Sequence, residues 1–163
     1  MRLAGGGSRD DRTRTSTGGR AVTVSGALTE PFCHVHRVTY AECTLGNHVY
    51  YARYLDLLEA ARGAMFRAAG CPFAALQEDG VIFPVIGVAL EYAEAARYDD
   101  EVRVETWVTH AHRVRLAFAY RVVGPAGKVL VTASTRHVCT DLSDKPRRLP
   151  EALVSALAPW MSV

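Results

Sequence analysis

Apolar and polar residues alternate most regularly in the second half of the chain. Within residues 113–123, Val114, Leu116, Phe118, Tyr120 and Val122 alternate with Arg113, Arg115, Ala117, Ala119 and Arg121. Within residues 101–112, Val102, Val104, Thr106 and Val108 oppose Arg103, Glu105 and Trp107. This period of two predicts strands with one buried face. Together with runs rich in β-branched residues, it predicts strands at 35–42, 81–92, 101–112, 114–123 and 129–140.

A different spacing follows the first predicted strand. Residues 44–47 have the composition of a turn, after which apolar residues recur mostly three or four positions apart: Tyr51, Tyr54, Leu55, Leu58, Ala61, Met65 and Ala69. Gly70 and Pro72 end this pattern. The sequence therefore predicts one long helix over residues 48–69. A short helix is expected over residues 150–160.

The order of the predicted elements is a strand, a long helix and then four strands. This order favours an α+β fold in which an antiparallel sheet of about five strands wraps around one long helix. The helix covers one face of the sheet, so the other face or an edge is left for a second subunit. A homodimer or homotetramer is expected.

Composition limits the number of domains. The chain has 163 residues, of which 49% are hydrophobic, enough for one domain with a real core. Residues 1–30 are rich in Gly, Ser, Thr and Arg and are expected to form a disordered leader, with the domain at 31–163. An organelle transit peptide shares the Arg, Ser and Thr content, but this segment lacks an amphipathic apolar face and contains acidic residues.

Charge and cysteine content exclude several classes of protein. The net charge is +2, so neither a nucleic acid nor an anionic membrane is expected as the main partner. No apolar run approaches the roughly 18 residues of a membrane span. The four cysteines form no C-x-x-C pair, so free thiols in a reducing cytoplasm are expected. The pairs His34/His36 and His110/His112 lack a third ligand, and no metal is expected.

Residues 42–54 are the part of the sequence richest in candidate chemistry. They place polar groups and a glycine at the amino end of the predicted helix, where unpaired N–H groups and the helix dipole favour negative charge. Such a position suits the oxyanion of an acyl-transfer intermediate.

This segment resembles the hotdog-fold acyl-CoA thioesterases of the 4-hydroxybenzoyl-CoA thioesterase and YbgC-like branch. The motif of that branch, Asp-x-x-Gly-His-Val-Asn/Tyr-Asn/Tyr-Ala-x-Tyr, matches at His48, Val49, Tyr50, Tyr51, Ala52 and Tyr54. The resemblance continues in the segments 59–62, 91–100 and 145–150, and covers about residues 34–155. It implies hydrolysis of an acyl-CoA thioester at a dimer interface, without a cofactor or metal.

Two positions depart from that motif. Thr44 stands where the branch has its catalytic aspartate, and Asn47 stands where it has glycine. A hydroxyl at ordinary pH cannot act as a carboxylate base or nucleophile. Thioesterases of enediyne polyketide pathways also lack the acid and have an arginine at the position of Arg62. By this looser resemblance, Thr44 positions a water beside Asn47 and His48, and N–H groups around Val49 and Tyr50 bind the oxyanion.

Several of these residues have a structural alternative. Thr44 also suits a turn cap and Asn47 a helix N-cap. His48 is either a base or a hydrogen-bonded structural group. Glu59 and Arg62 have the spacing of an ion pair on one helix face, but Glu59 would be the nearest substitute for the missing aspartate if that face points into the cleft.

Substrate contacts are expected on both sides of this segment. Tyr50, Tyr51 and Tyr54 would line an apolar groove for the acyl chain. Arg113 and Arg115 would share a strand face and meet phosphates of coenzyme A or of a carrier-protein arm, unless that face is simply solvated. The alternatives to an acyl-CoA thioesterase are an acyl-carrier-protein thioesterase of polyketide or fatty-acid biosynthesis and a non-catalytic module that binds acyl thioesters.

Overall fold

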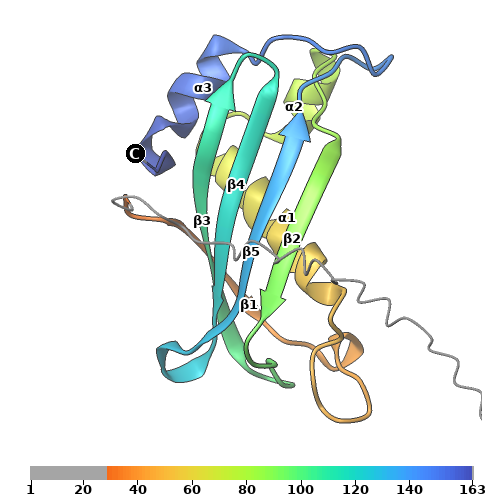
Figure 1. Ribbon diagram of the computed structural model, residues 1–163, viewed down its shortest axis with the longest axis vertical. Coiled ribbons are helices and arrows are strands. Elements are labelled where there is room, and N and C mark those ends of the chain that lie inside the picture. The colour runs from red at the N-terminus through yellow and green to blue at the C-terminus, as the bar shows by residue number, and fades with distance from the viewer. Residues whose placement is uncertain (1–28, 163) are drawn as a thin grey trace, which may run out of the picture.

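Five antiparallel strands form one sheet, and a long helix crosses one of its faces (Figure 1). The computed structural model describes residues 29–162, so most of the predicted leader lies outside the described residues. The strands are β1 (Phe32–Arg37), β2 (Val85–Tyr92), β3 (Glu101–His112), β4 (Arg115–Val123) and β5 (Val129–Val138). The helices are α1 (Arg53–Ala68), α2 (Phe73–Glu78) and α3 (Glu151–Leu157). The spatial order of the strands is β1-β3-β4-β5-β2.

The core lies between α1 and the sheet. Leu58, Ala61 and Met65 follow the spacing predicted for the helix and are fully buried. They face apolar residues of the inner sheet surface such as Val104 and Phe118, which are 0% and 1% exposed. The predicted α+β fold with a five-stranded antiparallel sheet is therefore confirmed.

The first strand and the long helix have different ends from those predicted. The strand predicted at 35–42 is wrong at its end, because β1 stops at Arg37 and residues Tyr40–Glu42 form a 3-10 turn. The helix predicted over 48–69 is wrong at its start, because α1 begins at Arg53. Residues before it pair with distant backbone instead, since the amide of Val49 donates to the carbonyl of Ala96 at 2.9 Å. Tertiary pairing thus overrides the helical spacing of residues 48–52.

The outer face of β3 is less exposed than simple alternation predicts. Trp107 is 2% exposed, and its indole N–H donates to the carbonyl of Thr29 at 2.8 Å. Glu105 is 5% exposed and accepts hydrogen bonds from Arg103 and Arg121 at 2.8 and 2.6 Å. The chain entering the domain at Thr29 and this ion-pair cluster therefore cover polar positions that alternation assigns to solvent.

Strand β2 forms one edge of the sheet and is apolar. It pairs with β5 on one side and, among the described strands, with none on the other. Val85, Ile86, Val88 and Tyr92 are each about half exposed, with 51%, 47%, 46% and 50% of their surface accessible. An exposed apolar edge strand is a template for pairing with another chain. Among the described residues, no helix is both long and apolar enough to cross a bilayer.

Candidate functional site

The loop before α1 contains a tight turn built by Thr44, Asn47 and His48. The amide and the hydroxyl of Thr44 both donate to the carbonyl of His48, at 2.8 and 3.2 Å. Asn47 has a positive φ of 52°, a backbone conformation that asparagine tolerates better than most residues. Its side-chain oxygen accepts a hydrogen bond from the amide of Tyr98 at 3.0 Å. Asn47 therefore joins two loops, and its predicted role as helix N-cap is wrong because the cap is Ala52.

The amides that follow this turn divide into two groups. The amide of Val49 donates to Ala96 and that of Tyr50 donates to the carbonyl of Glu42, both at 2.9 Å. The prediction that these two amides are free to bind an oxyanion is therefore wrong. Within the described chain, the amides of Tyr51 and Ala52 have no protein acceptor. They lie at the start of α1, where the helix dipole favours negative charge.

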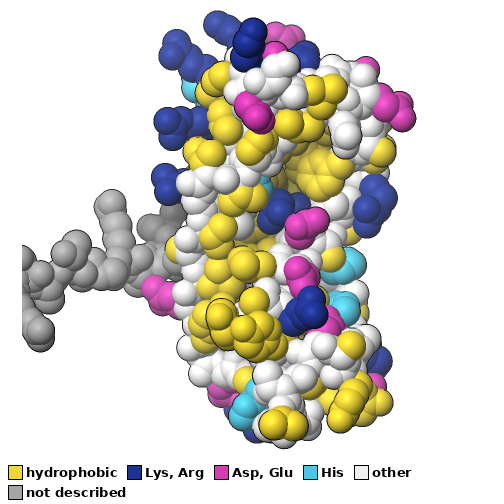
Figure 2. Space-filling view, turned by 90° about the vertical axis from the view of Figure 1, so that its right-hand side faces the viewer, with side chains coloured by type: hydrophobic (Ala, Val, Ile, Leu, Met, Phe, Trp, Pro, Cys, Tyr) yellow, Lys and Arg dark blue, Asp and Glu magenta, His cyan; other side chains and the backbone are white. Residues whose placement is uncertain are grey.

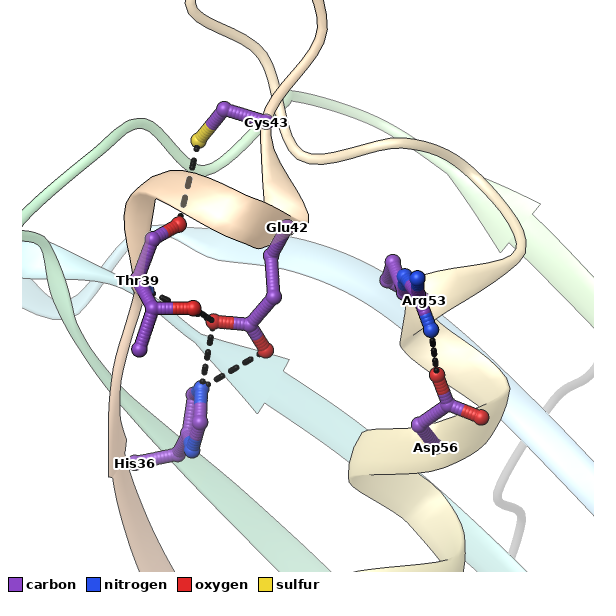
Figure 3. Close-up of polar contacts among 6 residues, drawn as sticks. All are labelled: His36, Thr39, Glu42, Cys43, Arg53 and Asp56. Atoms are coloured by element: carbon purple, nitrogen blue, oxygen red, sulfur yellow. Dashed lines mark hydrogen bonds and ion pairs between the residues drawn. The ribbon is translucent and has the colours of Figure 1, made fainter.

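A carboxylate close to this loop is fully engaged in holding it (Figure 3). Glu42 accepts hydrogen bonds from the amide and hydroxyl of Thr39 at 2.6 and 2.7 Å, and pairs with His36 Nε2 at 2.9 Å. Burial acts to raise the pKa of Glu42, but the hydrogen bonds from Thr39 and His36 outweigh it and lower that pKa. Glu42 is thus ionised and held by neighbouring residues, which suits a structural role. Arg53 and Asp56 form a separate pair on the first turn of α1 at 3.0 Å.

The three tyrosines expected to line an acyl groove have different environments. Tyr54 is 2% exposed, and its hydroxyl oxygen accepts a hydrogen bond from the amide of Ala96 at 2.9 Å. It is a core residue, so its predicted place in the groove is wrong. Tyr50 and Tyr51 are exposed at the start of α1, with their ring centroids 4.6 Å apart. The hydroxyl of Tyr92 in β2 donates to the carbonyl of Tyr51 at 3.1 Å and ties this segment to the sheet edge.

A cavity of about 360 Å³ lies farther along α1, between this helix, α2 and the segment before β2. Figure 2, which views the side of the molecule carrying β2 and α1, shows a hollow among hydrophobic side chains with basic and acidic side chains beside it. Most of the wall is aromatic or aliphatic, and the polar side chains are few. The lining residues are Glu59, Arg62, Phe66, Phe73, Gln77, Val81, Ile82, Phe83, Pro84, Val85, Leu116, Phe118 and His137.

Glu59 and Arg62 both face this cavity but do not pair with each other. Glu59 is exposed, whereas Arg62 is 8% exposed. No ion pair joins them within residues 29–162, so the predicted ion pair is wrong. The guanidinium of Arg62 instead donates to the hydroxyl of Tyr120 at 3.1 Å.

Arg62 begins a chain of buried hydrogen bonds across the sheet. The hydroxyls of Tyr120 and Thr135 are 2.9 Å apart, and Thr135 lies 2.9 Å from Nε2 of His137. Nδ1 of His137 lies 3.2 Å from the carbonyl of Phe83, which can only accept. The neutral imidazole must therefore donate through Nδ1 and accept from Thr135 through Nε2. Thr135 then accepts from Tyr120, so each hydrogen bond in the chain has one direction.

His137 stays neutral at ordinary pH. Burial and, to a smaller extent, the charge of Arg62 lower its pKa from 6.5 to about 4, although the hydrogen bond to Phe83 acts in the opposite direction. Burial also raises the pKa of Tyr120. This network was not predicted from the sequence. The available sign of it in the sequence was the presence of polar residues at inward-facing positions of the strand predicted at 129–140. Such positions rarely hold polar residues.

The basic residues predicted to bind phosphates are arranged differently from the prediction. Arg113 has a φ of 56° and lies in the turn between β3 and β4, so it does not share a strand face with Arg115. Arg115, Arg136 and His110 instead line a depression of about 270 Å³ next to Ile86 of β2. Among the described residues, no cluster of three or more His, Cys, Asp or Glu side chains could hold a metal ion.

The fold and loop geometry define a thioesterase-like domain, and comparisons with known proteins agree. The model of the thioesterase-like superfamily matches residues 38–157, so the chain belongs to this superfamily. It is 35% identical over 120 residues to the acyl-CoA thioester hydrolase YbgC of Escherichia coli, covering 73% of this chain and 90% of that protein.

Solved structures show the same fold. The DHNA-CoA thioesterase of Staphylococcus aureus is 27% identical with a TM-score of 0.72, covering 77% of this chain and 90% of that one. The dynemicin thioesterase is similar in fold, with a TM-score of 0.77, 22% identity, and coverage of 82% of this chain and 99% of that one. The resemblance to hotdog thioesterases is therefore confirmed at the level of the fold and superfamily.

Proposed function

We propose that this protein hydrolyses the thioester bond of an acyl-CoA to give the free acid and coenzyme A. The observation that carries the proposal is the pair of unpaired amides, Tyr51 and Ala52, at the start of α1 in a chain of the thioesterase-like superfamily. Relatives such as YbgC of Escherichia coli and of Haemophilus influenzae are named as acyl-CoA thioester hydrolases or thioesterases, which supports the expectation of a thioester hydrolase.

The active unit is proposed to be a homodimer joined along β2. Within one chain, Ala52 and Arg62 are ten residues apart, which is about 15 Å along the helix axis. Antiparallel pairing of β2 with its copy places the Val85 end of one strand beside the Tyr92 end of the other. Val85 lines the cavity and Tyr92 holds Tyr51, so the unpaired amides of one subunit come to the cavity of its partner.

The chemistry follows from this composite site. The thioester carbonyl oxygen lies against the amides of Tyr51 and Ala52, which stabilise the negative charge that develops when water attacks the carbonyl carbon. Glu59 is the carboxylate in the cavity wall and takes the proton of the attacking water. The C–S bond then breaks, and the proton passes to the departing thiolate of coenzyme A.

Thr44, which stands at the position of the aspartate in the YbgC-like motif, is proposed to hold the water. Its hydroxyl hydrogen is already donated to His48, so the oxygen can accept a hydrogen bond from water but cannot remove a proton. Asn47 and His48 shape the turn that presents Thr44. Arg115, Arg136 and His110 are proposed to meet the phosphates of coenzyme A beside the β2 edge. Unpaired thiols support a cytoplasmic location.

The test is to incubate the purified full-length protein with a panel of acyl-CoAs and acyl carrier proteins and to measure free thiol. Release from acyl-CoA supports the proposal. Release only from carrier protein would favour a carrier-protein thioesterase, and binding without release would favour a binding module. Both results would overturn the proposed substrate or reaction.

Two variants assign the roles within this site. Glu59→Gln should lower kcat by about 100-fold or more, as expected for loss of a general base. Thr44→Ala should lower kcat by about 10-fold because the water loses one of its partners. Glu151→Gln, an exposed position in α3, is the matched control. Full turnover in Glu59→Gln would exclude Glu59 as the base.

A further inference from the structure

Arg62 is a buried cation that faces the cavity and has no carboxylate partner within residues 29–162. It is 8% exposed and lines the cavity, and one guanidinium nitrogen donates to Tyr120. The fully enclosed side-chain atoms that lack a partner in residues 29–162 are the hydroxyls of Thr106 and Thr140, and no nitrogen of Arg62 is among them. Its remaining N–H groups are therefore open to the cavity.

The hydrogen-bond chain that starts at Arg62 leaves only donors to a ligand. Tyr120 accepts from Arg62 and donates to Thr135, and Thr135 donates to His137. The imidazole of His137 is saturated by Thr135 and the carbonyl of Phe83. The groups left to a ligand are guanidinium N–H bonds, which cannot accept. The other polar side chains in the wall are Glu59 and Gln77, and both are exposed.

The rest of the surrounding wall is apolar. Phe66, Phe83, Leu116 and Phe118 line the cavity next to Arg62. A charged group in such surroundings loses hydration that Tyr120 alone does not replace. A ligand oxygen that accepts from the guanidinium would restore it with charge-assisted hydrogen bonds.

We propose that the acyl group of the substrate carries an oxygen that accepts hydrogen bonds from Arg62, as a ketone or a carboxylate within an otherwise apolar chain. The inference rests on the proposed function and gives Arg62 the role of a specificity-determining residue. A plain alkyl chain would leave the guanidinium N–H groups that face the cavity without an acceptor.

The first test compares acyl-CoAs matched in length. Hexanoyl-CoA, 5-oxohexanoyl-CoA and adipoyl-CoA differ in the presence and kind of the acceptor oxygen, and longer homologues of each vary its distance from the thioester. At the best length, an oxygenated acyl group should exceed the plain one by about 10- to 100-fold in kcat/KM. Equal or higher kcat/KM for the plain chains at every length would overturn the proposal.

Variants then assign this preference to Arg62. In Arg62→Met the ratio of kcat/KM for the oxygenated acyl-CoA to kcat/KM for the plain acyl-CoA should fall to near one. Arg62→Lys keeps the charge and should keep part of this ratio. Arg67→Met removes an exposed arginine of the same helix that does not line this cavity, and it should keep the wild-type ratio. An unchanged ratio in Arg62→Met would overturn the proposal. If that variant does not fold, an unchanged ratio in Arg62→Lys would count in the same way.

Binding separates this inference from the proposed function. Non-hydrolysable thioether analogues of the same acyl-CoAs can be titrated calorimetrically into the wild-type protein and Arg62→Lys. Tighter binding of the oxygenated analogues, weakened in the variant, would support the role of Arg62 even if no thioester is hydrolysed. Equal binding of plain and oxygenated analogues would overturn it, whether or not hydrolysis occurs.

Discussion

Acidification should destabilise this protein through His137. The pKa of this imidazole is lowered from 6.5 to about 4 by burial and by the charge of Arg62. Between these two values the unfolded chain binds a proton at this position and the native protein does not. The contribution of the neutral imidazole to the free energy of unfolding is therefore fully present above pH 6.5, and it is lost as the pH falls toward 4.

The size of this effect follows from the same pKa values. One pKa unit corresponds to about 1.36 kcal/mol, so the native state loses about 3 kcal/mol of unfolding free energy across this range. A loss of this size is a large fraction of the stability of a typical domain.

The assay is urea unfolding of the wild-type protein and His137→Gln at several pH values from 7 downward, monitored by far-ultraviolet circular dichroism. Glutamine can accept from Thr135 but does not titrate, so the difference between the two proteins isolates His137 from other titrating groups. This difference should change by about 3 kcal/mol in favour of the variant by pH 4. A difference that stays constant with pH would show that the native imidazole is not held neutral, and would refute the direction assigned to the hydrogen-bond chain.

Two further predictions concern the core and the sheet edge. Tyr54→Phe removes the acceptor of the buried Ala96 amide and should lower the unfolding free energy by about 1–3 kcal/mol, whereas Tyr40→Phe, at an 81% exposed side chain, should change it little in the same urea titration. Val88→Lys puts a charge on the apolar β2 edge and should convert the proposed dimer into monomers in sedimentation equilibrium, with Ser143→Lys in an exposed loop as control. Equal masses for wild type and Val88→Lys would contradict pairing along β2.

The strands of the second half were predictable because their side chains alternate strictly. The prediction for residues 101–112 agrees with β3, and that for 129–140 exceeds β5 by two residues. The start of α1 was not predictable in the same way, since the spacing of Tyr51 and Tyr54 is helical. What excludes residues 48–50 from the helix is a long-range hydrogen bond to Ala96, which local spacing cannot report.

The candidate site was predicted only in part, because local spacing does not report hydrogen bonds between distant segments. The motif around His48 located the loop, but assigning the free amides required knowledge of which neighbours accept from Val49 and Tyr50. The spacing of Glu59 and Arg62 suggested an ion pair, and only the packing of α1 on β4 shows that Arg62 points to Tyr120. Interactions between distant segments decide these assignments.

The placement of the two tryptophans determines what intrinsic fluorescence can report. Trp107 donates to the carbonyl of Thr29, and Trp160 packs edge-on against Phe32 with ring centroids 5.4 Å apart. Neither lines the cavity beside α1. Tryptophan emission from this protein therefore monitors the seam, by which we mean the region where the first and last segments of the described domain pack together. An emission change on adding substrate would indicate that occupancy is transmitted through the sheet to that seam.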